Sequence, residues 1–133
     1  MSAPQPPLTR SEQQQRTRTA LIDAADAIFA RDGYNAATLD DIAAAAGYTK
    51  GAIYSNFANK AGLYLAVLDR TLDQAITDGR SPYEAFAEDV ARGERTADEA
   101  QELARGYLLA SLEFITTAIR DEELAAQLDE RVT

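Results

Sequence analysis

Polar residues that favour helix N-termini recur along the sequence and divide it into segments with helical periodicity. They are Ser11, Thr38, Thr49, Asn59, Ser81 and Thr96. A side-chain oxygen at such a position accepts a hydrogen bond from a free backbone N–H in the first turn of the helix. Between these residues apolar side chains recur every three or four positions, and strict strand-like alternation is absent. The sequence therefore predicts an all-α fold.

The same signals predict where each helix begins and ends. Ser11 and Gln14 have capping-box spacing, so a first helix is expected from about residue 11 until Gly33 caps its C-terminus. Later helices are expected at about residues 39–46, 50–57 and 60–76, after Ser81, from Thr96 to about Ile119, and from residue 120 onward. The helix expected from Thr96 to about Ile119 is apolar on two stripes, so it needs partners on more than one side.

The chain contains neither cysteine nor histidine. Disulfides and thiol or imidazole catalysis are therefore excluded, and a metal site would have carboxylate ligands alone. Acidic pairs such as Glu122 and Glu123 fit a solvated helix surface better than a catalytic pair in an apolar setting. We expect no enzymatic activity, no metal and no cofactor.

The charge is divided unevenly along the chain. Residues before position 71 carry equal numbers of acidic and basic side chains, so the net charge of −9 belongs to the second half. This asymmetry suggests two units with different partners, and for the second half a solvated acidic surface is the favoured interpretation. No apolar run has the length of a membrane span, and the proline-rich start lacks the core of a signal peptide. A cytoplasmic protein without membrane contact is expected.

The stretch GYTKGAIYSNFANKAGLY, residues 47–64, carries the functional signal. Two short helices joined by a tight turn with Gly47 form a helix-turn-helix unit, whose second helix enters the major groove of DNA. Ile53 and Phe57 are expected to point inward. The candidate DNA contacts are Thr38, Thr49, Lys50, Gly51, Tyr54, Ser55, Asn56 and Lys60. Taken singly, the threonines are explained by capping and the lysines by solvation, so the inference rests on the joint pattern.

The motif TLDDIAAAAGYTKGAIYSNFANKAGLYLAVLD, with the helix and Gly-aromatic turn before it, resembles the DNA-binding domain of the TetR (tetracycline repressor-like) family. The resemblance covers roughly residues 16–72. It implies a homodimeric transcriptional repressor, the eight DNA contacts named above, and a C-terminal helical domain that binds a small-molecule effector. Tyr48, where a small aliphatic is usual, and Gly62, where an acidic residue is common, depart from the family pattern.

The expected organisation is a disordered tail (1–9), a helix-turn-helix domain (10–58), a connecting helix (59–79) and a partial regulatory domain (80–133). The candidates for a ligand pocket are Tyr83, Phe86, Tyr107, Leu108, Ser111, Phe114 and Ile115, although ordinary core packing is the favoured interpretation for most of them, because apolar residues at helical spacing usually just pack. Members of the family commonly dimerise through later helices, which this sequence does not include. The alternative hypothesis is therefore a protein-interaction module that does not bind DNA on its own.

Overall fold

The computed structural model of the protein describes residues 6–132. Within these residues there are seven α-helices and no strand, which confirms the predicted all-α fold. They are α1 (Arg10–Ala36), α2 (Leu39–Ala46), α3 (Lys50–Asn56), α4 (Lys60–Asp78), α5 (Pro82–Ala91), α6 (Ala97–Ile119) and α7 (Glu122–Val132). Of the predicted disordered tail, residues 1–5 lie outside the described part of the chain.

The helix starts agree with the predicted caps, with one exception. Side chains of the predicted residues cap α2 to α6: Thr38, Thr49, Asn59, Ser81 and Thr96. The first cap is Thr9 rather than Ser11. The Thr9 hydroxyl accepts from the Glu12 backbone N–H, and the Glu12 carboxylate accepts from the Thr9 N–H. This reciprocal box satisfies two free donors, so it fixes the helix start and leaves Ser11 inside the first turn.

Gly33 interrupts α1 at the place where the sequence predicts the end of the first helix. Its φ of 83° and ψ of 173° lie outside the helical region, in a conformation open almost only to glycine. The chain then makes one short turn, Tyr34 to Ala36, before Thr38 caps α2. The α1–α2 connection is therefore a separate structural unit and not a continuation of the α1 axis.

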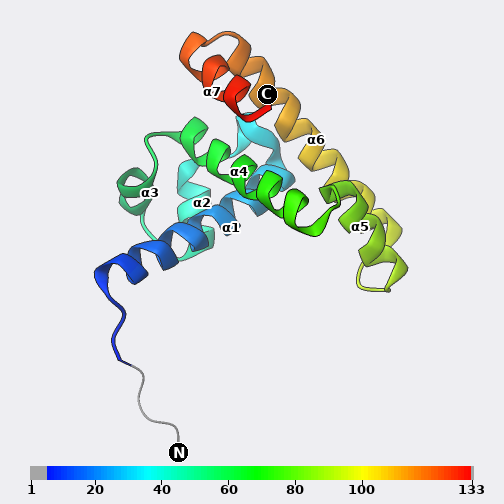
Figure 1. Cartoon of the computed structure of the whole chain (residues 1–133), viewed down its shortest axis with the longest axis horizontal. Coiled ribbons are helices and arrows are strands. Elements are labelled where there is room, and N and C mark those ends of the chain that lie inside the picture. Colours follow the sequence, from blue (N-terminus) through cyan, green and yellow to red (C-terminus); the bar gives the residue numbers. More distant parts are fainter. Residues whose placement is uncertain (1–5, 133) are drawn as a thin grey trace, which may run out of the picture.

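Helices α1, α2 and α3 gather at one end of the molecule, and α4 runs from there toward α5 (Figure 1). The α6 helix crosses α1 closely at Gly106, where an added Cβ would overlap the carbonyl oxygen of Ala30. The α7 helix folds back onto α4, and Arg131 donates to both carboxylate oxygens of Asp69 at 2.6 and 3.0 Å. Helix α6 is thus held against the same bundle that contains α2 and α3.

Four aromatic rings join these helices at their common centre. They are Phe29, Tyr34, Tyr64 and Phe114, all buried. The Phe114 ring of α6 stacks on Tyr64 of α4 with centroids 4.3 Å apart, and meets the edge of Tyr34 at 5.2 Å. Such pairs contribute about 0.5–1.5 kcal/mol beyond the area that they bury. The α1–α3 end and α6 therefore share one hydrophobic core.

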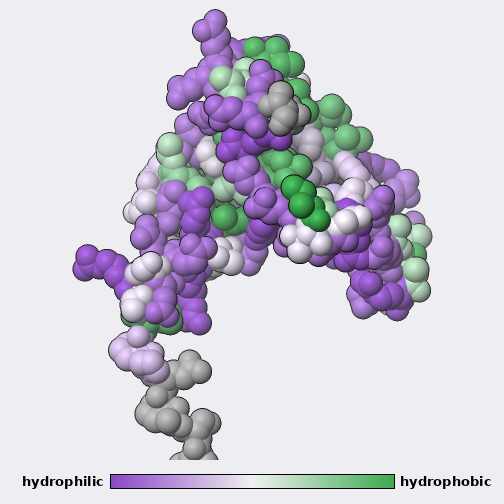
Figure 2. Space-filling view, viewed as in Figure 1, coloured by the Kyte–Doolittle hydropathy of each residue, from purple (hydrophilic) through white to green (hydrophobic). Residues whose placement is uncertain are grey.

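Apolar side chains are exposed on two surfaces of the structure, one on α6 and one near the end of α4. On α6, Leu108, Leu112, Ile115 and Ile119 are exposed, whereas Phe114 and Ala118 of the other stripe are buried. Near the end of α4, Ile76 is 81% exposed because this part of the helix extends beyond the shared core. Hydrophobic side chains are correspondingly visible at the surface on the α6 side of the molecule (Figure 2). Within residues 6–132, no helix is both long and apolar enough to cross a membrane.

Candidate nucleic-acid interface

The turn between α2 and α3 is fixed by its own backbone. Gly47 adopts a left-handed conformation, with φ of 79°, which ends α2. The backbone N–H groups of Gly47 and Tyr48 donate to the carbonyls of Ala44 and Ala43 at 3.2 and 2.9 Å. Thr49 then caps α3 by accepting from the N–H of Ala52 at 3.3 Å. These bonds set the angle between the two short helices before any side chain contacts a ligand.

Helix α3 has one packed face and one exposed face. Ile53 is completely buried and Phe57 nearly so, as the sequence predicts. On the outward face, Tyr54 is 55% exposed. The exposed candidate contacts are Thr49, Lys50, Gly51, Tyr54 and Ser55, with Asn56 half-buried beside them and Thr38 exposed at the start of α2. The fold therefore presents seven of the eight candidates from two adjacent helix starts and one short helix.

Within residues 6–132, no contact requires glycine at position 51. A Cβ added to Gly51 would have only the Thr49 hydroxyl within 4 Å, at 3.6 Å, which is ordinary contact. The backbone there is helical, so φ does not demand glycine either. A glycine within a helix costs about 1 kcal/mol relative to alanine. Its presence on the exposed face is explained if another molecule must approach the backbone closely.

Ser55 and Asn56 form hydrogen bonds within α3 in the free protein. The Ser55 hydroxyl donates to the Gly51 carbonyl at 3.0 Å, and the Asn56 amide donates to the Ala52 carbonyl at 2.9 Å. Arg18 of α1 donates to the Asn56 carbonyl at 3.2 Å and lies over the Phe57 ring at 4.5 Å. The end of α3 is therefore held by α1, while the serine and asparagine oxygens keep acceptor capacity for a ligand.

Lys50 and Lys60 have different environments, although the sequence assigns both to DNA contact. Lys50 is largely exposed, with its ammonium 3.8 Å from the Asp40 carboxylate. Lys60 instead donates to the carbonyls of Asn35 and Ala37 at 3.2 and 3.0 Å and lies 4.6 Å above the Tyr34 ring. Burial lowers the pKa of Lys60, and nearby Glu113 partly offsets this. Lys60 is thus engaged with the α1–α2 connection in the free protein.

An open groove of about 540 Å³ runs between the N-terminal part of α1 and α3. Its lining residues are Arg10, Gln13, Gln14, Thr17, Tyr48, Ala52, Ser55 and Asn56. Gln13, Gln14 and Thr17 are not among the contacts that the sequence predicts. These three residues lie on the polar face of α1. The sequence shows that this face is polar, but it becomes part of a candidate site only once α1 is known to lie beside α3.

Comparison with known proteins assigns one segment of the chain to a family. Residues 21–67 match the family model described as bacterial regulatory proteins, tetR family. This segment is a tetR-family domain. A match to regulatory proteins agrees with the prediction that the chain is not an enzyme.

Individual relatives of the chain are named as transcriptional regulators. The transcriptional activator FasR of Mycolicibacterium smegmatis is 34% identical over 116 residues, which is 84% of this chain and 51% of FasR. The regulator TtgR of Pseudomonas putida is 50% identical over 58 residues, covering 44% of this chain and 28% of TtgR. The structure of NalD, a Pseudomonas aeruginosa repressor, is 29% identical with a TM-score of 0.47, over 91% of this chain and 72% of NalD. The chain spans about half the length of FasR and less of TtgR.

The structure also contains a cavity of about 190 Å³ between α1, α4, α5 and α6. Of the predicted pocket residues, Phe86 and Tyr107 line it. Tyr83 packs edge-on against both rings at 6.5 and 5.5 Å, and burial raises the pKa of Tyr107 to about 12. Burial also raises the pKa of Asp26 in the wall, against the opposing charge of Arg70. The cavity thus combines aromatic rings with one desolvated carboxyl group.

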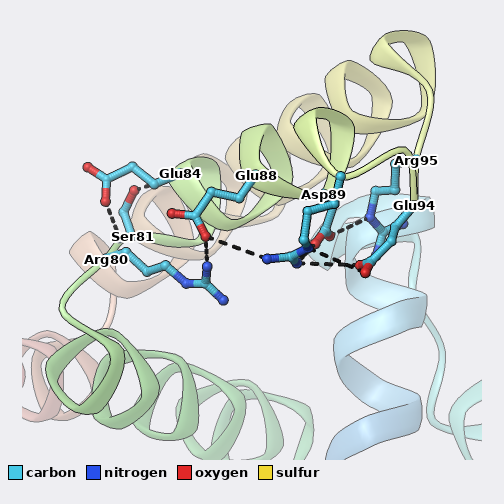
Figure 3. Close-up of polar contacts among 8 residues, drawn as sticks. Arg80, Ser81, Glu84, Glu88, Asp89, Glu94 and Arg95 are labelled. Atoms are coloured by element: carbon cyan, nitrogen blue, oxygen red, sulfur yellow. Dashed lines mark hydrogen bonds and ion pairs between the residues drawn. The ribbon is translucent and has the colours of Figure 1, made fainter.

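The other predicted pocket residues lie elsewhere. Phe114 belongs to the shared core, and Ser111 accepts from the Tyr64 hydroxyl at 3.3 Å. Leu108 and Ile115 are on the exposed face of α6, because helical geometry places them away from Tyr107 and Phe114. At the cavity rim, Arg80 pairs with Glu88, and Ser81 forms a capping box with Glu84 (Figure 3).

Proposed function

We propose that the protein is a sequence-specific DNA-binding transcriptional regulator that inserts α3 (Lys50–Asn56) into the major groove of a palindromic operator. The observation that carries this proposal is Gly51, a glycine on the exposed face of α3 that no contact in the described part of the chain requires. The tetR-family match of residues 21–67 and the names of the relatives support the class of function. We assign DNA reading to residues 10–58, the connecting helix to 59–79, and part of a regulatory domain to 80–133.

The proposed contacts divide into base reading and backbone positioning. Lys50, Ser55 and Asn56 can reach base edges from the N-terminal and outward parts of α3, with Gly51 allowing the close approach. The exposed hydroxyls are assigned to phosphate or sugar: Thr38, Thr49 and Tyr54. For Lys60 we revise the direct phosphate contact, because its ammonium already donates to two carbonyls. Lys60 would instead stabilise the orientation of α2 and α3 by binding the connection between α1 and α2.

We further propose that the regulator acts as a homodimer. Two copies of α3 would then contact half-sites separated by about 34–36 Å, one turn of the DNA helix. The contacts that hold the two copies together would come from outside α1–α3, since the exposed face of that bundle is assigned to DNA. Repression would follow from occupation of the operator.

The cavity beside Tyr107 is the proposed site of a small-molecule effector. Ligand pockets usually enclose about 300–1,000 Å³. A volume of about 190 Å³ therefore suits a small ligand, or one part of a larger ligand. The Phe86 and Tyr107 rings with the Asp26 carboxyl favour an aromatic or cationic group.

The test is a selection from a randomised DNA duplex library with the purified chain at low salt. An enriched palindrome would support the dimeric regulator, and a single enriched half-site would indicate a monomer that reads DNA. Absence of any enrichment would overturn the proposal and favour the protein-interaction module, which is then tested by association with a full-length relative.

A further inference from the structure

The connection between α1 and α2, residues 33–38, is held by charged side chains from two distant helices. Lys60, the first residue of α4, donates to the carbonyls of Asn35 and Ala37. Glu113 of α6 accepts from the Asn35 side-chain amide at 2.8 Å and from the Asn35 backbone N–H at 3.5 Å. The Lys60 ammonium therefore binds backbone carbonyls of this short segment, and the Glu113 carboxylate binds N–H groups of the same segment.

Glu113 also occupies a space that the backbone leaves open for it. An added Cβ on Gly33 would overlap the Glu113 carboxylate oxygen and would touch the side chain of Leu109. The positive φ of Gly33 favours glycine, and the absence of a Cβ there leaves room for the Glu113 carboxylate in the position that it occupies. This overlap is independent of the hydrogen bonds to Asn35, and it shows that the Glu113 carboxylate packs directly against the backbone of the connection.

The position of Glu113 follows from the close packing of α6 on α1. Gly106 lies so close to the backbone of Ala30 that an added Cβ would overlap the Ala30 carbonyl group. Glu113 lies seven residues further along α6, about 10 Å from that crossing at 1.5 Å per residue. Phe114, the next residue, is buried against Tyr34 and Tyr64. The Glu113 carboxylate is therefore fixed in position relative to α1.

The connection leads directly to the proposed DNA-reading helices. Asn35 lies three residues before Thr38, the cap and first proposed phosphate contact of α2. Helix α2 is joined to α3 by the hydrogen-bonded turn at Gly47. A displacement of residues 35–37 would therefore change the orientation of α2 and α3 relative to α1.

We propose that Glu113 is a positioning residue for DNA binding: its paired hydrogen bonds to Asn35 hold the α1–α2 connection in the orientation that α2 and α3 need on DNA. The inference rests on the proposed function. Glu113 lies in α6, outside the DNA-reading segment, so it would affect DNA affinity without contacting DNA.

The test uses the full chain and four variants. Glu113→Ala removes both acceptors, and Asn35→Asp places two carboxylates together. Each should lower affinity for the selected duplex roughly tenfold, the size of coupling typical of residues in direct contact. The double variant Asn35→Asp with Glu113→Gln restores the pair with its polarity reversed, and should recover affinity to within about threefold of the original. Glu102→Ala, on the same helix, is the charge-matched control, because the Glu102 side chain forms no hydrogen bond or ion pair within the described residues.

Two readouts separate positioning from other roles. The slope of log affinity against log salt should be unchanged in Glu113→Ala, because no phosphate contact is lost. Amide hydrogen exchange in the DNA-free protein should increase at residues 34–41 and remain unchanged in α7. Unchanged exchange at residues 34–41, or a double variant no better than Asn35→Asp alone, would overturn the proposal.

The same experiment distinguishes failure of this inference from failure of the proposed function. If the unaltered chain binds no duplex, the proposed function is wrong, and with it the role in DNA binding. Hydrogen exchange still reports whether Glu113 holds the connection. If the unaltered chain binds but Glu113→Ala binds equally well, only the positioning role is wrong.

Discussion

Gly51 leads to a prediction in which stability and DNA affinity change in opposite directions. Gly51→Ala should raise the free energy of unfolding by about 0.5–1 kcal/mol, because alanine favours the helix and its methyl group meets only Thr49. The same methyl group would lie between α3 and DNA, so affinity should fall by about tenfold, or 1.4 kcal/mol. Urea denaturation and fluorescence anisotropy measure the two quantities.

Gly62→Ala is the matched control, since Gly62 also lies in a helix and its added Cβ would meet only the Asn59 side chain at 3.5 Å. Stabilisation without any loss of affinity is expected there. If Gly51→Ala binds DNA as well as the original chain does, close backbone approach does not explain the glycine.

The two lysines should differ in the salt dependence of DNA binding. Lys50→Ala removes an exposed cation, so the slope of log affinity against log salt should decrease by up to about 0.9. Lys60→Ala removes two hydrogen bonds from a charged donor, so it should lower the free energy of unfolding by about 1–3 kcal/mol and leave the slope unchanged. Anisotropy titrations at several salt concentrations test both. A reduced slope in Lys60→Ala would restore its direct contact with phosphate.

At the scale of helices, the sequence predicts what is determined locally. The caps Thr38, Thr49 and Asn59 could be predicted because a cap depends only on residues within one helical turn. The helical segments, the inward direction of Ile53 and the α2–α3 turn follow from the same short range. The outward side chains of α3 could therefore be predicted as a candidate site before the structure.

Contacts between distant helices could not be predicted in this way. Lys60 is a plausible DNA contact by sequence, but its actual partners are carbonyls at residues 35 and 37. Nothing local in Gly106 indicates the crossing with α1, and nothing local in Glu113 indicates Asn35. Likewise, which apolar stripe of α6 is buried depends on where α1 and α4 lie.

The α1–α6 crossing predicts that alanine is harmful in the middle of α6. By helix propensity alone, Gly106→Ala should stabilise the protein by about 1 kcal/mol. Its methyl group would instead overlap the Ala30 carbonyl, so we expect a loss of about 1–3 kcal/mol as the helices separate. Thermal and urea unfolding give the sign of the change, with Gly62→Ala as the control for propensity. An increase in stability would mean that α6 does not cross α1 at Gly106.

For the whole molecule, charge and core are distributed differently. Residues 1–70 are balanced in charge, while the acidic excess behind the net charge of −9 lies in the remainder. A proposed DNA-binding end can thus exist in a chain whose isoelectric point is about 4.4. The hydrophobic core does not follow this division, because Phe114 and Ala118 of α6 are buried with Leu21 and Ile53 of the α1–α3 end. We therefore expect both parts to unfold together.

Phe114→Ala tests this shared core. The ring is fully buried between α4 and the α1–α2 connection, so its removal should lower the free energy of unfolding by about 3–5 kcal/mol. The space left by the missing ring would lie in the core that all these helices share. Amide exchange should therefore rise in α2 and α3 as much as in α6. Leu112→Ala, on the exposed face of the same helix, is the control and should change stability by no more than about 0.5 kcal/mol. Exchange that rises in α6 alone would mean that α1–α3 folds independently, and that α6 can influence DNA binding only through Glu113.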